Sequence, residues 1–364
     1  MHDPASFRAE FPVLARRAYL NAGTCGPVPA RAARAAAEAI GAEAEGGRSG
    51  QEHFARLGES AAALRAGYAR WLGCEPGCVA LTTSTSAGVN TVVSGLGLRQ
   101  GDEVLTSDEE HPGVLAPLAS ARERFGIEVR VVPFDSLAGA VTSRTRLVAC
   151  SHVSWVSGQV VDAVGLAASE APVLLDGAQG LGALELDMAA LGCDFYAASG
   201  QKWMCGPDGT GCLYVRPGRV EALGVPFPSY ASLAGAADPL DLDLHEGARR
   251  FDLGSLPSAS VAWALASLEL LDGAGGPWVT ARAAELAARL AAALSEGGRE
   301  VLPRGDTTLV SWRDAEASTT VAGLAEAGIV VRELPGRGLV RASVGAWSSE
   351  EELDRLAGLA CATA

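Results

Sequence analysis

The chain has 364 residues, of which 48% are hydrophobic and 20% are charged, and its formal net charge is −14. This composition is typical of a folded globular protein and not of a disordered chain. The acidic balance argues against a nucleic-acid partner and against binding to an anionic membrane, because both require basic surfaces.

The sequence contains no recognisable targeting segment and no metal-binding pattern. No run of about 18 uncharged apolar residues occurs, so no transmembrane helix is predicted. The start, MHDPASFRAEFPVL, carries early acids and does not resemble a signal peptide. The eight cysteines are scattered, without a CxxC pair or a Cys/His cluster, which predicts free thiols and no metal site. We expect a cytoplasmic protein.

The first two thirds of the chain read as a series of strands and helices. An Ala-rich helix is predicted over 28–46 and another over 60–72. Further helices are predicted from about 86 and near 113–124. Apolar runs predict strands over 78–83, 102–108, 128–134, 145–153, 171–178, 193–200 and 211–216. Continuous apolar strands separated by helices indicate a mainly parallel sheet covered on both faces, which is an α/β domain.

A second, smaller domain is predicted at the C-terminal end. The stretch 225–248 is rich in Pro, Gly and Asp and reads as a connector. Helices follow over 258–273 and 277–296. The apolar runs TTLVSW, IVVREL and LVRASV then predict strands, with a helix over 319–327 and a last one after SSEEEL. We therefore divide the chain into a large domain over 15–250 and a small α+β domain over 251–364 together with 1–14.

Lys202, in ASGQKWMCGP, is the only lysine in a chain whose other basic side chains, apart from five histidines, are arginines. Arginine stays protonated, whereas a lysine amine can lose its proton and form a Schiff base with a carbonyl, including that of pyridoxal 5'-phosphate (PLP). A lysine retained by chance on the surface is the alternative. Its position after an apolar stretch and before a tight polar turn favours a catalytic amine.

Three polar positions follow predicted strands, where open α/β sheets bind ligands. Asp176 ends VLLD and could pair with a protonated pyridine nitrogen, or cap a turn. The hydroxyls of LTTSTSAGVN lie where a helix begins and could hold a phosphate, or serve as ordinary caps. His111, in DEEHPGV, could stack on a planar ring, or lie solvated in a loop. Together with Lys202, these positions predict a PLP site.

These segments resemble the class V aminotransferase-fold family, which comprises fold type I PLP enzymes and includes the cysteine desulfurases. The resemblance extends over LTTSTSAGVN, DEEHPGV, SHVSWVSGQV, LLDGAQG, ASGQKWMCGPDGTG, RRFDLGS and LVRASVGAW, in the family's order, and so covers nearly the whole chain. It implies a fold type I PLP-dependent transferase, with a large, mainly parallel-sheet domain and a smaller α+β C-terminal domain.

The resemblance also implies a role for each residue of the cofactor site. Lys202 would carry PLP as a Schiff base and shuttle the proton, and Asp176 would hold the pyridine nitrogen. Gln179 would touch the ring hydroxyl and His111 would stack on the ring. The phosphate would be held by Thr85, Ser86 and Ser199. Gln201 stands where the family commonly has histidine, so one phosphate contact is expected to be weaker.

The family's substrate and dimer contacts are carried over in the same way. Arg341, in LVRAS, would clamp the substrate carboxylate. Asn21 and Cys25, in YLNAGTCGPVP, would border the substrate. Ser255, in DLGS, would reach the phosphate of the neighbouring subunit, which implies a homodimer with active sites at the interface. Trp155, in SHVSWVSGQV, would contact the substrate, since this segment resembles the cyst(e)ine C–S lyase branch of the family. Packing in the core is the alternative for Trp155.

One departure from the family narrows the reaction. Desulfurases that form a protein persulfide need a cysteine on the loop before the carboxylate-binding arginine, and GIVVRELPGRGLVRAS contains none. The only cysteine after Cys212 is Cys361, in the last predicted helix. We expect a PLP-dependent C–S lyase acting on cystine, cysteine or a related S-substituted cysteine by Cα deprotonation and β-elimination. An aminotransferase or an amino-acid epimerase of the same family is the alternative, and a non-catalytic scaffold is a third reading.

Overall fold

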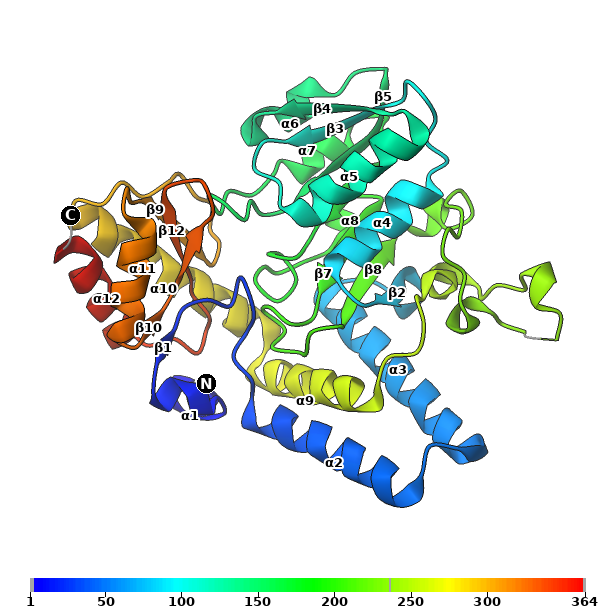
Figure 1. Ribbon diagram of the computed structural model, residues 1–364, viewed down its shortest axis with the longest axis horizontal. Coiled ribbons are helices and arrows are strands. Elements are labelled where there is room, and N and C mark those ends of the chain that lie inside the picture. The colour runs from blue at the N-terminus through cyan, green and yellow to red at the C-terminus, as the bar shows by residue number, and fades with distance from the viewer. Residues whose placement is uncertain (1–2, 236, 363–364) are drawn as a thin grey trace.

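The computed structural model describes residues 3–235 and 237–362 and contains a large lobe built on one sheet. The sheet has seven strands in the order β2-β8-β7-β6-β5-β3-β4 (Figure 1). Every strand runs parallel to the others except β8, which is antiparallel to both of its neighbours. The mainly parallel sheet is thereby confirmed. The strands are β2 (Val79–Thr82), β3 (Glu103–Ser107), β4 (Glu128–Val132), β5 (Thr145–Ser151), β6 (Val173–Asp176), β7 (Phe195–Ser199) and β8 (Gly211–Val215).

The central strands are apolar throughout because helices cover both faces of the sheet. On β5, Leu147 and Ala149 belong to one buried cluster, whereas Val148 and Cys150 belong to the other, as the alternation of a strand requires. The first cluster includes side chains of α4 (Thr85–Gly95) and α5 (Pro112–Phe125). The second includes side chains of α3 (Gly50–Leu72), α6 (Leu137–Ala140), α7 (Ala163–Ala167) and α8 (Met188–Leu191).

The small lobe, on the left of Figure 1, has an antiparallel sheet in the order β11-β12-β9 and its own buried core. Its strands are β9 (Leu309–Arg313), β11 (Arg332–Leu334) and β12 (Leu339–Ser343), and its helices are α10 (Gly276–Glu296), α11 (Ala317–Glu326) and α12 (Glu350–Ala362). The α+β character predicted for this region agrees with this arrangement.

The amino-terminal segment lies beside the small lobe. The short strand β1 (Ala18–Tyr19) pairs in parallel with β10 (Ile329–Val330). After α1 (Pro4–Ala9), the ring of Phe11 lies 5.2 Å from that of Trp347. The assignment of residues 1–14 to the small domain stays a prediction. The exact division at residue 250 stays a prediction.

Two further helices join the lobes. α2 (Ala30–Gly46) and α9 (Ser258–Ala274) pack against each other, and α9 also contacts α3 (Figure 1). The helix α3 begins at Gly50, ten residues before the predicted start at 60. Its first turns are mostly exposed, so the apolar periodicity that would reveal a helix is missing there. The predicted connector after β8 contains only short 3-10 turns among the residues described.

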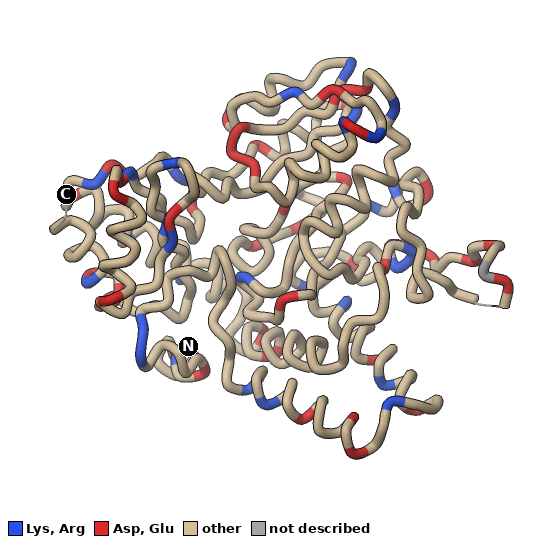
Figure 2. The backbone as a smooth tube through the Cα atoms, viewed as in Figure 1, with Lys and Arg blue, Asp and Glu red and all other residues tan. Residues whose placement is uncertain are grey.

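Acidic and basic residues alternate along the backbone of both lobes (Figure 2). Many are paired; the buried pair of Arg65 and Asp252, 2.7 Å apart, joins α3 to the segment before α9. Within 3–235 and 237–362, no helix combines the length and the hydropathy needed to cross a bilayer.

Candidate active site

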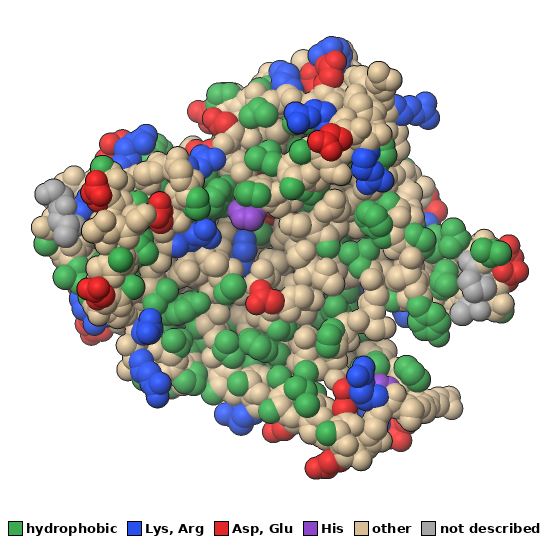
Figure 3. Space-filling model, viewed as in Figure 1, with side chains coloured by type: hydrophobic (Ala, Val, Ile, Leu, Met, Phe, Trp, Pro, Cys, Tyr) green, Lys and Arg blue, Asp and Glu red, His purple; other side chains and the backbone are tan. Residues whose placement is uncertain are grey.

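The carboxyl ends of the parallel strands meet at one edge of the sheet, and a cavity of about 210 Å3 opens there. It is lined by residues that follow β2, β3, β5, β6 and β7, by the turn after β1, and by two arginines of the small lobe. The space-filling view shows a histidine and basic side chains gathered in a hollow between the lobes (Figure 3). The lining residues are Gly23, Thr24, Ser84, Thr85, Ser86, His111, Gly113, Trp155, Asp176, Ala178, Gln179, Ser199, Gln201, Lys202, Arg332 and Arg341.

Nine predicted cofactor and substrate residues of this chain therefore share one cavity with His111. Eight of them come from the ends of four strands of the large sheet, β2, β5, β6 and β7, and the ninth, Arg341, comes from β12 of the small lobe. The nine are Thr85, Ser86, Trp155, Asp176, Gln179, Ser199, Gln201, Lys202 and Arg341.

One end of the cavity has the donors that a phosphate needs. The helix α4 begins there, with Ser84 as its N-cap accepting the backbone N–H of Ala87. The buried hydroxyls of Thr85 and Ser199 have no hydrogen-bond partner within the described part of the chain. Buried hydroxyls without partners are costly, and free N–H groups at a helix N-terminus attract anions. These groups fit the phosphate of PLP.

Lys202 and Asp176 line the cavity together and affect each other's pKa. Burial lowers the pKa of the Lys202 amine from 10.5 to about 8, an effect that Asp176 opposes and Arg341 reinforces. Burial raises the pKa of the Asp176 carboxyl, while Lys202 and the N–H of Ala178, which donates to its Oδ1 at 2.9 Å, lower it. An amine that loses its proton near neutral pH is able to react with an aldehyde.

Gln179 has a fixed orientation in the wall of the cavity. Its Nε2 donates to the carbonyl of Gly23 at 2.9 Å, and its Oε1 accepts the indole N–H of Trp203 at 3.0 Å. An indole N–H only donates, so it must face the amide oxygen. The second N–H of the Gln179 amide therefore remains available, as its predicted contact with the ring hydroxyl of PLP requires.

His111 begins α5 as its N-cap, with Nδ1 accepting the N–H of Gly113 at 3.0 Å. Its ring meets that of Trp155 edge to face, with centroids 5.1 Å apart. Burial, followed by Lys202 and two arginines, lowers the pKa of His111 to about 4. The ring is therefore neutral at physiological pH, which suits stacking on a planar cofactor.

Two arginines reach the cavity from the small lobe, and only Arg341 was predicted from the sequence. Arg332 is its direct partner across β11 and β12. The Nη1 of Arg341 donates to the carbonyl of Trp155 at 2.7 Å, while its Nε and Nη2 are buried without partners within the described residues. Arg332 donates to the hydroxyl of Thr24 at 3.2 Å. In IVVREL, Arg332 has the pattern of an ordinary strand residue, and only its register with LVRAS would have revealed it.

Asn21 and Ser255 do not line this cavity. Asn21 accepts the hydroxyl of Thr24 at 2.9 Å, so it holds a lining residue in place. Ser255 is exposed on the segment before α9. The role predicted for Ser255 involves a second subunit and stays a prediction, as does direct substrate contact by Asn21.

Thiols are absent from the cavity lining among the described residues. Cys25 is half-buried near Lys202, and burial raises the pKa of its thiol. Cys361 lies in α12, where its Sγ contacts the carbonyl of Leu294 at 3.9 Å. No group of three or more His, Cys, Asp or Glu side chains in the described ranges is placed to bind a metal ion.

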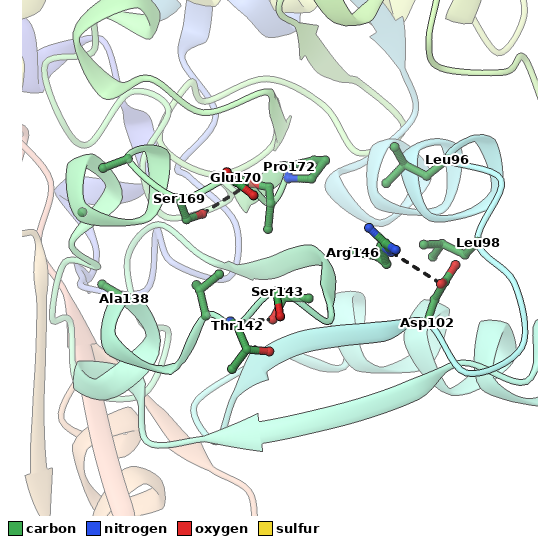
Figure 4. Close-up of a pocket in the computed structure, with 15 residues that line it drawn as sticks. Leu96, Leu98, Asp102, Ala138, Thr142, Ser143, Arg146, Ser169, Glu170 and Pro172 are labelled. Atoms are coloured by element: carbon green, nitrogen blue, oxygen red, sulfur yellow. Dashed lines mark hydrogen bonds and ion pairs between the residues drawn. The ribbon is translucent and has the colours of Figure 1, made fainter.

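A second, more open hollow of about 700 Å3 lies at the opposite edge of the sheet (Figure 4). Asp102, just before β3, and Arg146, near the amino end of β5, both line it, with the Arg146 Nε 3.7 Å from the Asp102 Oδ1. Ligands of open α/β sheets bind at the carboxyl ends of strands, which favours the cavity around Lys202 as the active site.

Comparison with known proteins gives a family match over most of the chain. A family model described as aminotransferase class-V matches residues 18–356. The isopenicillin N epimerase of Streptomyces clavuligerus is 32% identical over 80% of this chain and 82% of the relative. A probable cysteine desulfurase of Pseudomonas aeruginosa is 31% identical over 98% of this chain and 97% of the relative.

Solved structures give the same picture. The cystine C–S lyase C-DES in complex with its product cysteine persulfide has a TM-score of 0.89, with 29% identity over 96% of this chain and 99% of that one. A lysine-to-alanine mutant of C-DES, with glycine covalently linked to its PLP cofactor, has a TM-score of 0.90 and 29% identity over 97% of this chain and 98% of that one. The predicted fold type I architecture and the PLP cofactor are thereby confirmed.

Proposed function

The chain belongs to the aminotransferase class-V family of PLP-dependent enzymes, and we propose that it is a carbon–sulfur lyase acting on cystine, cysteine or a related S-substituted cysteine. The observation that carries this proposal is the cavity itself, in which Lys202 faces two arginines and, among the described residues, no thiol. When bound, PLP supplies an electron sink that weakens the Cα–H bond of an amino acid.

The groups around Lys202 are suited to moving a proton at Cα. With a pKa of about 8, the amine both accepts and returns a proton near neutral pH. Asp176 supplies a buried carboxylate for the pyridine nitrogen, and Gln179 supplies a fixed amide N–H for the ring hydroxyl. His111, which is neutral, would cover one face of the ring.

The two arginines indicate the shape of the substrate. The free Nε and Nη2 of Arg341 form one edge of the guanidinium, which matches a carboxylate with two parallel hydrogen bonds. Arg332 adds a second cation on the neighbouring strand, facing the same cavity. Cystine carries two carboxylates, so one arginine would bind each.

The leaving group explains why no enzyme thiol is needed. After the proton leaves Cα, the Cβ–S bond breaks and its electron pair departs with sulfur. From cystine the departing fragment is cysteine persulfide, and the remaining three-carbon unit is hydrolysed to pyruvate and ammonia. The similarity to C-DES, whose structure contains cysteine persulfide as reaction product, supports this assignment.

The experiment is to incubate the PLP-loaded protein with L-cystine or L-cysteine and to measure pyruvate. We expect pyruvate from cystine, its loss in Lys202→Ala, and its retention in Cys25→Ser, which serves as the matched thiol control. Absence of pyruvate with every sulfur amino acid would contradict the proposal. Loss of activity in Cys25→Ser alone would instead indicate a thiol-dependent reaction.

Epimerisation is the second candidate, because the similarity to isopenicillin N epimerase extends over 80% of this chain. Both reactions begin with removal of the Cα proton, and they diverge only when that proton is returned. Loss of optical rotation of an amino acid without release of pyruvate would favour epimerisation. Both assays run in D2O would show, by deuterium at Cα, whether the Cα proton is removed. The two reactions would then be distinguished by the step that follows its removal.

A further inference from the structure

Glu109 lies outside the cavity lining, between β3 and α5, and is half-buried. Its Oε2 accepts two hydroxyls from one turn after β5: that of Ser157 at 2.7 Å and that of Ser154. A carboxylate that accepts two hydroxyls makes charge-assisted bonds, which are about twice as strong as neutral ones. The carboxylate therefore ties the loop before α5 to the turn formed by residues 154–157.

These bonds determine how the turn is built. The hydroxyl of Ser154 donates its hydrogen bond to Glu109. The hydroxyl oxygen of Ser154 is therefore free to accept hydrogen bonds from the backbone N–H groups of Val156 and Ser157, both at 3.1 Å. The turn is closed by the N–H of Gly158, which donates to the carbonyl of Ser154 at 3.0 Å. A serine without its acceptor could turn its hydroxyl proton elsewhere and lose this arrangement.

The turn carries the one group to which the described structure anchors the Arg341 guanidinium. This group is the carbonyl of Trp155, which accepts Nη1 at 2.7 Å. The opposite edge of the guanidinium, formed by Nε and Nη2, is left without partners although Arg341 is fully buried. The direction of a single peptide carbonyl thus decides where the free edge of Arg341 points.

We propose that Glu109 is a positioning residue for Arg341, which acts through the turn 154–157 to aim the free edge of the guanidinium at the substrate carboxylate. The inference rests on the proposed role of Arg341 as the carboxylate clamp. The neighbouring Glu110 serves a different part of the site, because its carboxylate accepts the hydroxyls of Ser107 and Ser151 at the cofactor end of the sheet.

The test compares binding of glycine with binding of glycinamide, which lacks the carboxylate. The change in the visible spectrum of bound PLP gives both dissociation constants for the wild type, Glu109→Ala, Glu109→Gln and Glu123→Ala. Glu123 is an exposed glutamate on α5 and is the matched control. The affinity for PLP itself is measured for each variant.

Glu109→Ala is expected to reduce the preference for glycine over glycinamide about tenfold, because the clamp is no longer aimed. Glu109→Gln keeps an acceptor oxygen in place and should restore most of the preference, while Glu123→Ala should leave it unchanged. Affinity for PLP should stay within about twofold of the wild-type value throughout, since the phosphate contacts and Asp176 lie on other elements and His111 keeps its own N-cap bond from the N–H of Gly113.

The proposal is overturned if Glu109→Ala weakens glycine and glycinamide equally, because that result describes a purely structural role. A wild-type protein that does not prefer glycine would instead refute the role of Arg341, and with it the proposed function. If Glu109→Ala does not fold, Ser157→Ala decides the question. A several-fold loss of preference supports the proposal, and an unchanged preference overturns it.

Discussion

At the scale of a single residue, Lys202 stands out by its residue type in an arginine-rich chain and by the burial that lowers its pKa. The chain uses arginine at almost every other cationic position, yet a guanidinium cannot supply a neutral amine. Burial then lowers the pKa of this amine to about 8, so about a tenth of it is neutral at pH 7. With an ordinary pKa of 10.5 the neutral fraction would be about three in ten thousand.

The first prediction concerns the pH dependence of PLP binding to the apoprotein. The neutral amine is the reactive form, so the rate of covalent association should rise with pH and level off above about 8. Stopped-flow absorbance at pH 6 to 10 measures it, with N-acetyl-lysine amide as the reference amine. A rate that keeps rising beyond pH 9, as it should for the reference amine, would contradict the lowered pKa.

The second prediction concerns Glu110, a buried carboxyl whose pKa is raised by burial from 4.5 to about 7, with a further contribution from Asp176. Between these pH values the folded protein holds a proton that the unfolded chain has released. The free energy of unfolding therefore falls as pH rises through this window, by about 3 kcal/mol from this group.

Glu110→Gln removes this titration. In urea unfolding of the apoprotein, the variant should gain stability relative to the wild type, by about 3 kcal/mol between pH 4 and pH 8. The comparison cancels other titrating groups such as His152, whose pKa is lowered to about 4. A difference between the two proteins that does not change with pH would show that folding leaves the pKa of Glu110 unshifted.

At the scale of elements, the strand ends were predictable and the contacts between distant elements were not. Apolar runs followed by Asp176, Ser199 or His111 mark where strands stop, and in a parallel sheet those stops share one edge. Arg332 was missed because only its pairing with Arg341 across β11 and β12 places it at the cavity. The hydrophobic pattern of a sequence does not show which residues pair across two strands. Asn21 accepts a hydrogen bond from the hydroxyl of Thr24, a contact that depends on the pairing of β1 with β10 and that the sequence pattern did not reveal, while its predicted contact with the substrate stays a prediction.

The third prediction tests how α3 is held to the segment before α9. Arg65 and Asp252 are both buried, and Asp252 also accepts the N–H of Leu81 at 2.8 Å. Asp252→Asn leaves the guanidinium buried without its counter-ion, which should cost about 3–5 kcal/mol of unfolding free energy. Denaturant unfolding measures it.

The exposed pair of Glu52 and Arg56, 3.0 Å apart on α3, provides the comparison. Glu52→Gln should change the unfolding free energy by less than about 0.5 kcal/mol, since a solvated pair contributes little. Equal effects of the two substitutions would mean that the Arg65–Asp252 pair is solvated in solution.

At the scale of the whole molecule, the contact predicted for Ser255 would require a second subunit. Ser255 is exposed and away from the cavity, yet the resemblance assigns it to a cofactor phosphate. Both statements hold together if two subunits pair so that Ser255 of each enters the other's active site.

The last prediction uses two variants that should each be defective alone: Lys202→Ala, which lacks the reactive amine, and Ser255→Asp, which places a negative charge against the phosphate. If the sites are shared, a heterodimer of the two contains one site with both lesions and one site with neither. Mixing, mild denaturation and reassembly should therefore restore up to about a quarter of wild-type activity, because half of the dimers are mixed and each has one intact site. Light scattering should give the mass of a dimer for both variants. If each chain builds its own site, every site carries one lesion and mixing restores nothing, which would show that Ser255 does not act across an interface.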